Sequence, residues 1–331
     1  MNRRNLLKNS LWAGLAVALP VNYSKAKVFE KIPTNKNGGF KKLKLGDLEL
    51  TILTDGHILQ KPIQPFMCPL APEKELNSIL KANFRSIDEV DMAMNVLLIK
   101  KGNQNILLDS GMGMFANSED NHWLLQSLAE AGIKPESITE IFISHAHPDH
   151  IGGLVDHSQH LVFPNATVYI SKTEYDFWRK ATISDFSKSP LSKQPDFLNP
   201  IIKGIQLILK TVQPKLRFYP DNGLLFDTFQ FALIPGHTPG MVSITVQSKN
   251  EKLVYIADLI HHDILLFQHP EWGYSGDTDL EIATETRKKT LAELSNSKIK
   301  VFAYHLPWPG LGFVGKENQQ YKWFPEPFAT I

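Results

Sequence analysis

The chain has 331 residues, of which 43% are hydrophobic, and its formal net charge is +1. This composition excludes a disordered chain and allows a large core in one elaborated domain or in two. Residues 1–26 hold four basic side chains and no acid, so the remainder carries a formal charge of −3. We expect no nucleic-acid partner, because phosphate binding needs a concentrated basic surface.

Residues 1–26 have the pattern of an export signal. Arg3 and Arg4 precede a short apolar run that Pro20 closes, and small residues follow at 24–26 as a cleavage site. The run is too short to span a bilayer, which takes about 20 residues. The paired arginines followed by "NLLK" resemble a twin-arginine signal, with an ordinary secretory signal or an anchor as alternatives. We therefore expect an exported, periplasmic protein without a stable membrane anchor.

The rest of the chain is expected to contain one folded domain. Residues 27–44 are polar and basic and predict a linker or a surface arm, so the domain is placed at residues 45–331. Cys68 is the only cysteine, which excludes an intramolecular disulfide. We interpret it as a small buried hydrophobic residue without chemistry.

Mixed strands and helices predict a layered α/β sandwich. Two hairpins of similar design are expected over residues 96–111 and 243–259, with Asp109 and Asp258 near their ends. They suggest two related half-domains, although hairpins also repeat by chance. Hydrophobic periodicity further predicts strands over residues 48–55, 138–144 and 298–305 and helices over residues 121–132, 196–210 and 279–296.

The stretch "FISHAHPDHIGG" concentrates metal-binding side chains on a loop after an apolar strand. At this composition, H-x-H-x-D-H is expected by chance only about once in a thousand such chains. His145 and His147 share one face of an extended loop, while Asp149 and His150 come where the chain turns. Four ligands so close in sequence cannot reach one ion without strain. We therefore expect two adjacent ions, since one ion would leave Asp149 as a buried unpaired charge.

Two catalytic ions need further ligands, because each takes about three protein side chains and keeps a position for water. His237, Asp258 and His305 each follow an apolar strand, where a layered sheet places functional side chains. Any one of them alone would more often be a capping or packing residue. Together with the first cluster they become candidate ligands.

The ordered ligand set resembles the signature of the metallo-β-lactamase fold superfamily, from about residue 48 to the C-terminus. This resemblance implies a four-layer αββα sandwich and a pair of divalent ions, zinc first, with manganese, cobalt or iron as alternatives. It implies that Asp258 bridges the ions and that Asp109 orients the ligands without binding metal. The ligand sets that it implies are His145, His147 and His237 for one ion, and Asp149, His150 and His305 for the other.

Within that superfamily the chain looks most similar to the methyl parathion hydrolase branch. No cysteine stands near Asp258, unlike in zinc β-lactamases, and only 26 residues follow His305, unlike in glyoxalase II. The matching strings are "HAHPDHIGGL", "FPNATVYISKTEYDFW", "GHTPGM" and "HLPWPGLG". This resemblance implies a homodimer and an apolar leaving-group pocket lined by Phe115, Trp178 and Phe197, for which core packing is the alternative.

The expected function is a binuclear-metal hydrolase in which a metal-bridging hydroxide cleaves esters with apolar leaving groups. Organophosphate triesters, aryl esters and lactones all belong to that class. An acyl-homoserine lactonase is the main alternative, since such enzymes share all seven ligands. A di-iron redox protein or a non-catalytic metal-binding protein is the second. His261 and His262 follow Asp258 closely enough to reach the pocket, although adjacent residues usually face apart.

Overall fold

The computed structural model describes residues 39–328. The predicted export signal lies outside these residues, as does most of the predicted linker. The sheet begins earlier than expected, because Phe40–Leu45 forms β1 and pairs antiparallel with β2. Residues 40–44 therefore belong to the domain and not to a linker. No helix in the described part of the chain is long and apolar enough to cross a membrane.

The first sheet has seven strands that lie in chain order. Neighbours from β1 to β4 are antiparallel, and those from β4 to β7 are parallel. A register shift between Thr54 and His57 interrupts the pairing of β2 with β3. The strands after β1 are β2 (Leu48–Gln60), β3 (Val90–Lys101), β4 (Gln104–Leu108), β5 (Glu140–Ile143), β6 (Thr167–Ser171) and β7 (Leu216–Tyr219).

The second sheet also has seven strands, from β14 at one edge to β8 at the other. Only β11 and β12 pair in parallel, so both sheets are mixed. Its strands are β8 (Gly223–Leu225), β9 (Phe229–Leu233), β10 (Val242–Ser248), β11 (Glu251–Tyr255), β12 (Lys300–Phe302), β13 (Leu311–Glu317) and β14 (Gln320–Pro325).

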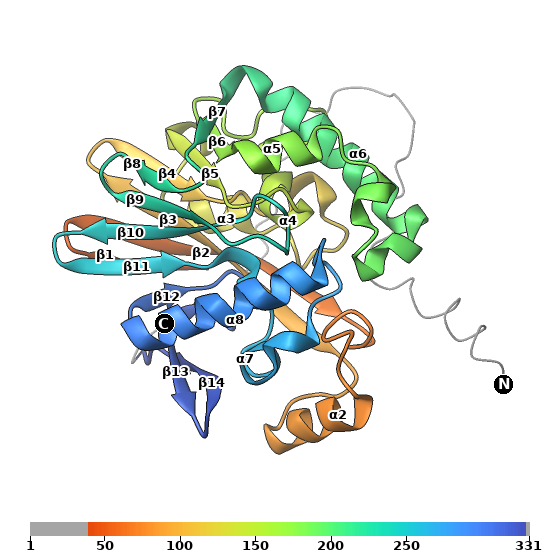
Figure 1. The fold of residues 1–331 in the computed structure, drawn as a ribbon. Helices are drawn as coiled ribbons and strands as arrows, with labels where there is room; N and C mark the ends of the chain where they lie inside the picture. Colours follow the sequence, from red (N-terminus) through yellow and green to blue (C-terminus); the bar gives the residue numbers. More distant parts are fainter. Residues whose placement is uncertain (1–38, 329–331) are drawn as a thin grey trace.

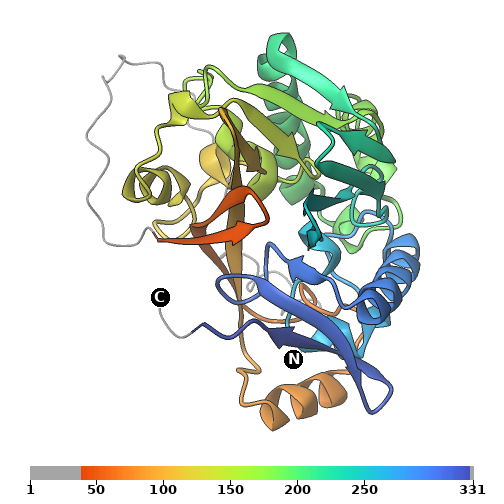
Figure 2. The ribbon, with the colours of Figure 1, turned by 90° about the vertical axis from the view of Figure 1, so that its left-hand side faces the viewer.

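Helices cover the outer faces of the two sheets (Figures 1 and 2). Helix α3 packs on β2 and α5 on β6, whereas α8 packs on β13 of the second sheet. The predicted αββα sandwich is therefore confirmed. The helices are α2 (Glu73–Ala82), α3 (Leu124–Glu130), α4 (Pro148–Ile151), α5 (Lys172–Trp178), α6 (Pro195–Val212), α7 (Leu265–Gln268) and α8 (Leu280–Ser297).

Aromatic rings join the two sheets across the core. Phe142 of β5 is fully buried, and its ring lies edge-on to Phe229 and Phe231 of β9, with centroids 5.0 Å and 5.5 Å away. Tyr219 of β7 stacks on Phe231 at 4.1 Å. Edge-on and offset contacts suit the charge distribution of aromatic rings, which adds to the apolar area that they bury. This packing holds the strand ends of both sheets in one place.

The chain beyond β4 packs tightly on the segment that follows β5. Gly153 lies so close to Ser110 that an added Cβ would stand 1.8 Å from the Ser110 carbonyl oxygen. The Ser110 backbone N–H and hydroxyl both donate to the carbonyl oxygen of His150, each at 2.8 Å. The glycines after His150 thus permit the close approach that brings Asp109 and His150 together.

Removing the Phe142 ring tests how far the sheets depend on this packing. We expect Phe142→Ala to lower the free energy of unfolding by about 3–5 kcal/mol, because it opens a cavity between the two sheets. The matched control is Phe84→Ala, since Phe84 is 97% exposed, and its change should stay within about 0.5 kcal/mol. Denaturant unfolding monitored by circular dichroism measures both. Equal effects of the two substitutions would show that the Phe142 ring does not hold the two sheets together.

Candidate metal centre

The predicted ligands all follow strand ends on one side of the sandwich. His145 and His147 lie directly after β5, and Asp149 and His150 lie in the first turns of α4, which Pro148 begins. A proline suits this first position because it has no N–H to leave unpaired. The other three come from the second sheet: His237 lies between β9 and β10, Asp258 in the 3₁₀ turn Ala257–Leu259, and His305 after β12.

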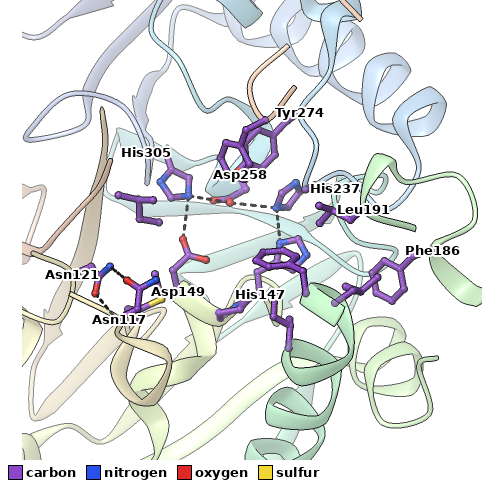
Figure 3. A pocket seen from close by; sticks show the side chains of 18 of the residues that line it. Asn117, Asn121, His147, Asp149, Phe186, Leu191, His237, Asp258, Tyr274 and His305 are labelled. Atoms are coloured by element: carbon purple, nitrogen blue, oxygen red, sulfur yellow. Dashed lines mark hydrogen bonds and ion pairs between the residues drawn. The ribbon is translucent and has the colours of Figure 1, made fainter. Parts of the chain in front are cut away.

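The seven side chains converge into two groups that share Asp258. One group contains His145, His147, His237 and Asp258, the other Asp149, His150, Asp258 and His305, and the candidate ligand atoms of each lie within 4.8 Å of one another. His147 Nδ1 is 2.8 Å from His237 Nε2 on one side. His305 Nε2 is 3.2 Å from Asp149 Oδ2 on the other. Figure 3 shows Asp258 between the two sides.

Asp258 contacts both groups through its two carboxylate oxygens. Oδ2 lies 3.3 Å from His237 Nε2 and 3.1 Å from His305 Nε2, and Oδ1 lies 3.0 Å from His150 Nε2. The carboxylate is buried, which alone would raise its pKa, but His150 and His305 hold the pKa well below its ordinary value. An ionised carboxylate at this place can bridge two cations.

The donor atoms fit a pair of divalent ions. His145 Nε2, His150 Nε2 and Asp258 Oδ1 are buried, and none of the three forms a hydrogen bond among residues 39–328, although the last two atoms lie 3.0 Å apart. Leaving such atoms unpaired is costly unless an ion takes them as ligands. Burial holds the pKa of His145 and His147 well below the ordinary value, so both rings are neutral, the form that binds metal. Nitrogen and oxygen donors without thiolate suit zinc, manganese, cobalt or iron.

Comparisons with known proteins agree with this geometry. The family model of the metallo-beta-lactamase superfamily matches residues 91–302. The chain belongs to the metallo-beta-lactamase superfamily. A solved structure described as AidC, a dizinc quorum-quenching lactonase in complex with the product N-hexanoyl-L-homoserine, is 53% identical. The match covers 89% of this chain and 100% of AidC, with a TM-score of 0.87.

Two further solved structures extend the comparison. AbOPH, described as a hydrolase in the beta lactamase superfamily, is 30% identical over 88% of this chain and 99% of its own, with a TM-score of 0.78. A probable metal-dependent hydrolase from Staphylococcus aureus is 17% identical over 87% of this chain and 100% of its own, with a TM-score of 0.65, which supports the fold alone. No curated protein matches the chain. The chain is thus a metal-dependent hydrolase of this fold.

Asp109 lies beside the ring of His150. It is fully buried, and its Oδ2 accepts from His150 Nδ1 at 2.8 Å. The backbone N–H of Ser144 donates to Oδ1 at 2.6 Å, and the hydroxyls of Ser144 and Tyr255 donate to Oδ2. Its backbone φ of 63° is unusual for a residue other than glycine, which agrees with a functional constraint. Asp109 therefore fixes the ring of His150 with Nε2 toward the centre.

Glu174 is a buried carboxylate that the sequence did not reveal. It accepts four hydrogen bonds at 2.7–2.9 Å, from Ala146 N, Trp178 Nε1, Thr238 Oγ1 and Gly240 N. Burial raises its pKa, against these donors. Ala146 separates two ligands and Thr238 follows a third, so Glu174 ties together the loops that carry His145, His147 and His237.

His261 also lies at the centre, whereas His262 faces elsewhere. His261 Nε2 is 3.1 Å from Asp258 Oδ2, and its ring stacks on Tyr274 with centroids 3.6 Å apart. His262 Nδ1 instead accepts from the backbone N–H groups of Ile264 and Leu265. The expectation that these adjacent side chains face apart is thus confirmed, and only the first contacts a candidate ligand.

An apolar pocket opens onto the metal centre. Trp178 and Phe197 line it, as expected, together with Phe66, Phe186 and Leu191. Phe115 was wrongly expected there: it is not among the lining residues, and its ring lies against Gly204 of α6. Met112, three residues earlier in the chain, lines the pocket instead. Gly204 leaves room for the Phe115 ring, and the sequence pattern alone does not show this contact.

Replacing the shared carboxylate should disable both ion sites. We expect Asp258→Ala to reduce bound metal from two ions per chain to one or none and to abolish hydrolysis. The reason is that both groups of candidate ligands lose the carboxylate that they share. Elemental analysis and turnover on the same sample measure this. Asp88→Ala is the control, since Asp88 is exposed and far from the ligand groups in sequence. Wild-type turnover in Asp258→Ala would contradict the shared-ligand assignment.

Proposed function

We propose that this chain is a dizinc lactonase that opens the ring of N-acyl homoserine lactones. The likeness to AidC, described as a dizinc quorum-quenching lactonase with N-hexanoyl-L-homoserine as product, supports both the metal and the substrate. The match extends over the whole length of AidC at 53% identity. Such a lactonase is one kind of two-metal hydrolase that acts on a small-molecule ester.

The observation that carries the proposal is the shared position of Asp258 at the floor of an apolar pocket. Its two oxygens contact donors of both groups at 3.0–3.3 Å, and it lines the pocket with His147, Asp149, His237 and His305. Divalent cations held there supply Lewis acidity, which polarises a carbonyl and promotes the ionisation of water. The side chains determine where a substrate carbonyl must lie to react.

The pocket walls suit a substrate with a polar head and an apolar tail. Phe186 and Leu191 lie on the His237 side of the centre in Figure 3, whereas Asn117 and Asn121 lie on the Asp149 side. An acyl chain is expected along the apolar wall, where each buried methylene contributes about 0.8 kcal/mol. The lactone ring ester is then held over Asp258. Water adds at the ring carbonyl, the ring C–O bond breaks, and the freed ring oxygen takes a proton.

The broader expectation of ester hydrolysis with apolar leaving groups still includes organophosphate triesters and aryl esters. The likeness to AbOPH, described only as a hydrolase, is compatible with such side activities at lower rates. Placement in the methyl parathion hydrolase branch and assembly as a homodimer stay predictions. A di-iron redox protein and a non-catalytic metal-binding protein are the alternatives. Measurements of metal content and turnover distinguish them from a hydrolase.

A substrate panel tests the proposal directly. The zinc-loaded protein should open N-acyl homoserine lactones with a higher kcat/KM than it shows for an aryl ester or a phosphotriester. Proton release at constant pH follows the first, and chromogenic leaving groups follow the others. Faster phosphotriester turnover would favour the broader reading over the lactonase. A zinc-replete protein without turnover on any of them would overturn both.

The apolar wall should determine the preferred acyl chain. We expect Phe197→Ala to lower kcat/KM for a long acyl chain by about 10–200-fold, the range for lost apolar contacts, and to leave a short chain nearly unaffected. Phe218→Ala, on β7 and outside the pocket, serves as the control. Equal losses for short and long chains would show that Phe197 supports the fold and not the tail.

We propose further that the enzyme acts outside the cytoplasm. The paired Arg3 and Arg4 before an apolar run support export through the twin-arginine route. Arg3→Lys combined with Arg4→Lys keeps the charge but changes the pair, so the enzyme should accumulate in the cytoplasm. Cell fractionation with activity assays measures this. Unchanged export of the double variant would favour an ordinary secretory signal.

A further inference from the structure

We propose that Asp277, held in place by Arg287, is a buried positioning residue that sets the zinc affinity of the group containing His145, His147 and His237 and not that of the other group. Neither residue belongs to a ligand group, and both are fully buried, at 0% and 1% exposure. Their ion pair, Arg287 Nη2 to Asp277 Oδ2 at 3.1 Å, lies behind the ligand ring of His237.

Asp277 fixes which nitrogen of His237 faces the centre. Its Oδ1 lies 2.9 Å from His237 Nδ1. When Nδ1 donates to this carboxylate oxygen, Nε2 keeps its lone pair for an ion. That Nε2 stands 2.8 Å from His147 Nδ1 and 3.3 Å from Asp258 Oδ2, toward the shared centre. Without this acceptor the ring could turn or take the other tautomer.

Arg287 holds Asp277 in place. The guanidinium donates through Nε to the carbonyl oxygen of Leu259 at 2.8 Å and through Nη1 to that of Pro270 at 2.9 Å. Leu259 follows Asp258 along the chain, so Arg287 also contacts the turn that carries the ligand shared by both groups, and the selective effect on one group is expected from Asp277 alone.

The second ligand group is oriented by different residues. His150 Nδ1 contacts Asp109, and His305 Nδ1 lies 2.9 Å from the carbonyl oxygen of Ala93. Within residues 39–328, neither Asp109 nor Ala93 forms a hydrogen bond with Asp277 or Arg287. Each ion site therefore has its own outer contacts, and the two affinities can be changed separately.

Zinc affinity, measured by competition with a chromogenic chelator, tests the proposal without any substrate. Asp277→Asn should weaken one of the two zinc ions about 10–100-fold, the usual effect of losing such an outer partner, and leave the other unchanged. The matched control is Asp279→Asn, two residues away, because Asp279 begins α8 and pairs with Lys188 instead. That control should keep both affinities.

Double variants identify which site is affected. In a His237→Ala background, Asp277→Asn should add no further loss, because the ring that it orients is gone. In a His305→Ala background it should keep its full effect on the remaining zinc. Full additivity with His237→Ala, wild-type affinity at both sites, or equal weakening of both sites would each overturn the proposal.

A second variant keeps the test decisive if Asp277→Asn does not fold. Arg287→Lys retains the buried positive charge but cannot make the same set of bonds to Leu259, Pro270 and Asp277. It should weaken the zinc of the group containing His145, His147 and His237 more than the other zinc, because Asp277 contacts only that group. Retained affinity at both sites in a folded Arg287→Lys variant would overturn the proposal. These results stand apart from the lactonase assay, since zinc binding is measured without turnover.

Discussion

The buried carboxylate of Asp258 is the constraint on which the rest of the structure depends. Burying an ionised carboxylate is costly unless cations or strong hydrogen bonds surround it. Here donor nitrogens of His150, His237, His261 and His305 approach it to 3.0–3.3 Å. Because these residues come from both sheets, the two halves must pack with their strand ends in register before the carboxylate has any partner. The aromatic contacts around Phe142 supply that packing.

Three buried carboxylates outside the ligand groups orient the candidate ligands and the loops that carry them. A histidine side chain has two rotatable bonds and two tautomers, so convergence alone does not place the right nitrogen at the centre. Asp109 and Asp277 each accept from one ligand ring, while Glu174 accepts from the backbone of the ligand loops. Each is buried and held by neighbouring donors. Fixed acceptors of this kind cost little reorganisation when a substrate arrives.

Patterns that are local in sequence predicted the fold and the seven side chains that converge in it. The hairpins over residues 96–111 and 243–259 and the helices over residues 121–132, 196–210 and 279–296 all have counterparts in the structure. The ligand cluster was visible because four members fall within six residues. The sequence did not reveal the roles of Glu174 and Asp277. An acidic residue in a helix or just before one usually faces solvent, and the partners of these two lie up to 66 residues away in the chain. Strands β6 to β9, β13 and β14 were missed, and those with three to five residues carry little periodicity.

The ligand groups and the pocket walls have different consequences for specificity. An enclosed centre with apolar walls strengthens the electrostatic interaction between the ions and a developing negative charge, whichever ester is bound. The ligand set alone therefore does not distinguish lactones from aryl esters or phosphotriesters. Side chains such as Trp178 and Leu191 instead set the shape of the pocket beside His237. Trp178 also donates to Glu174, so this pocket wall and the loops that carry His145, His147 and His237 share one buried support.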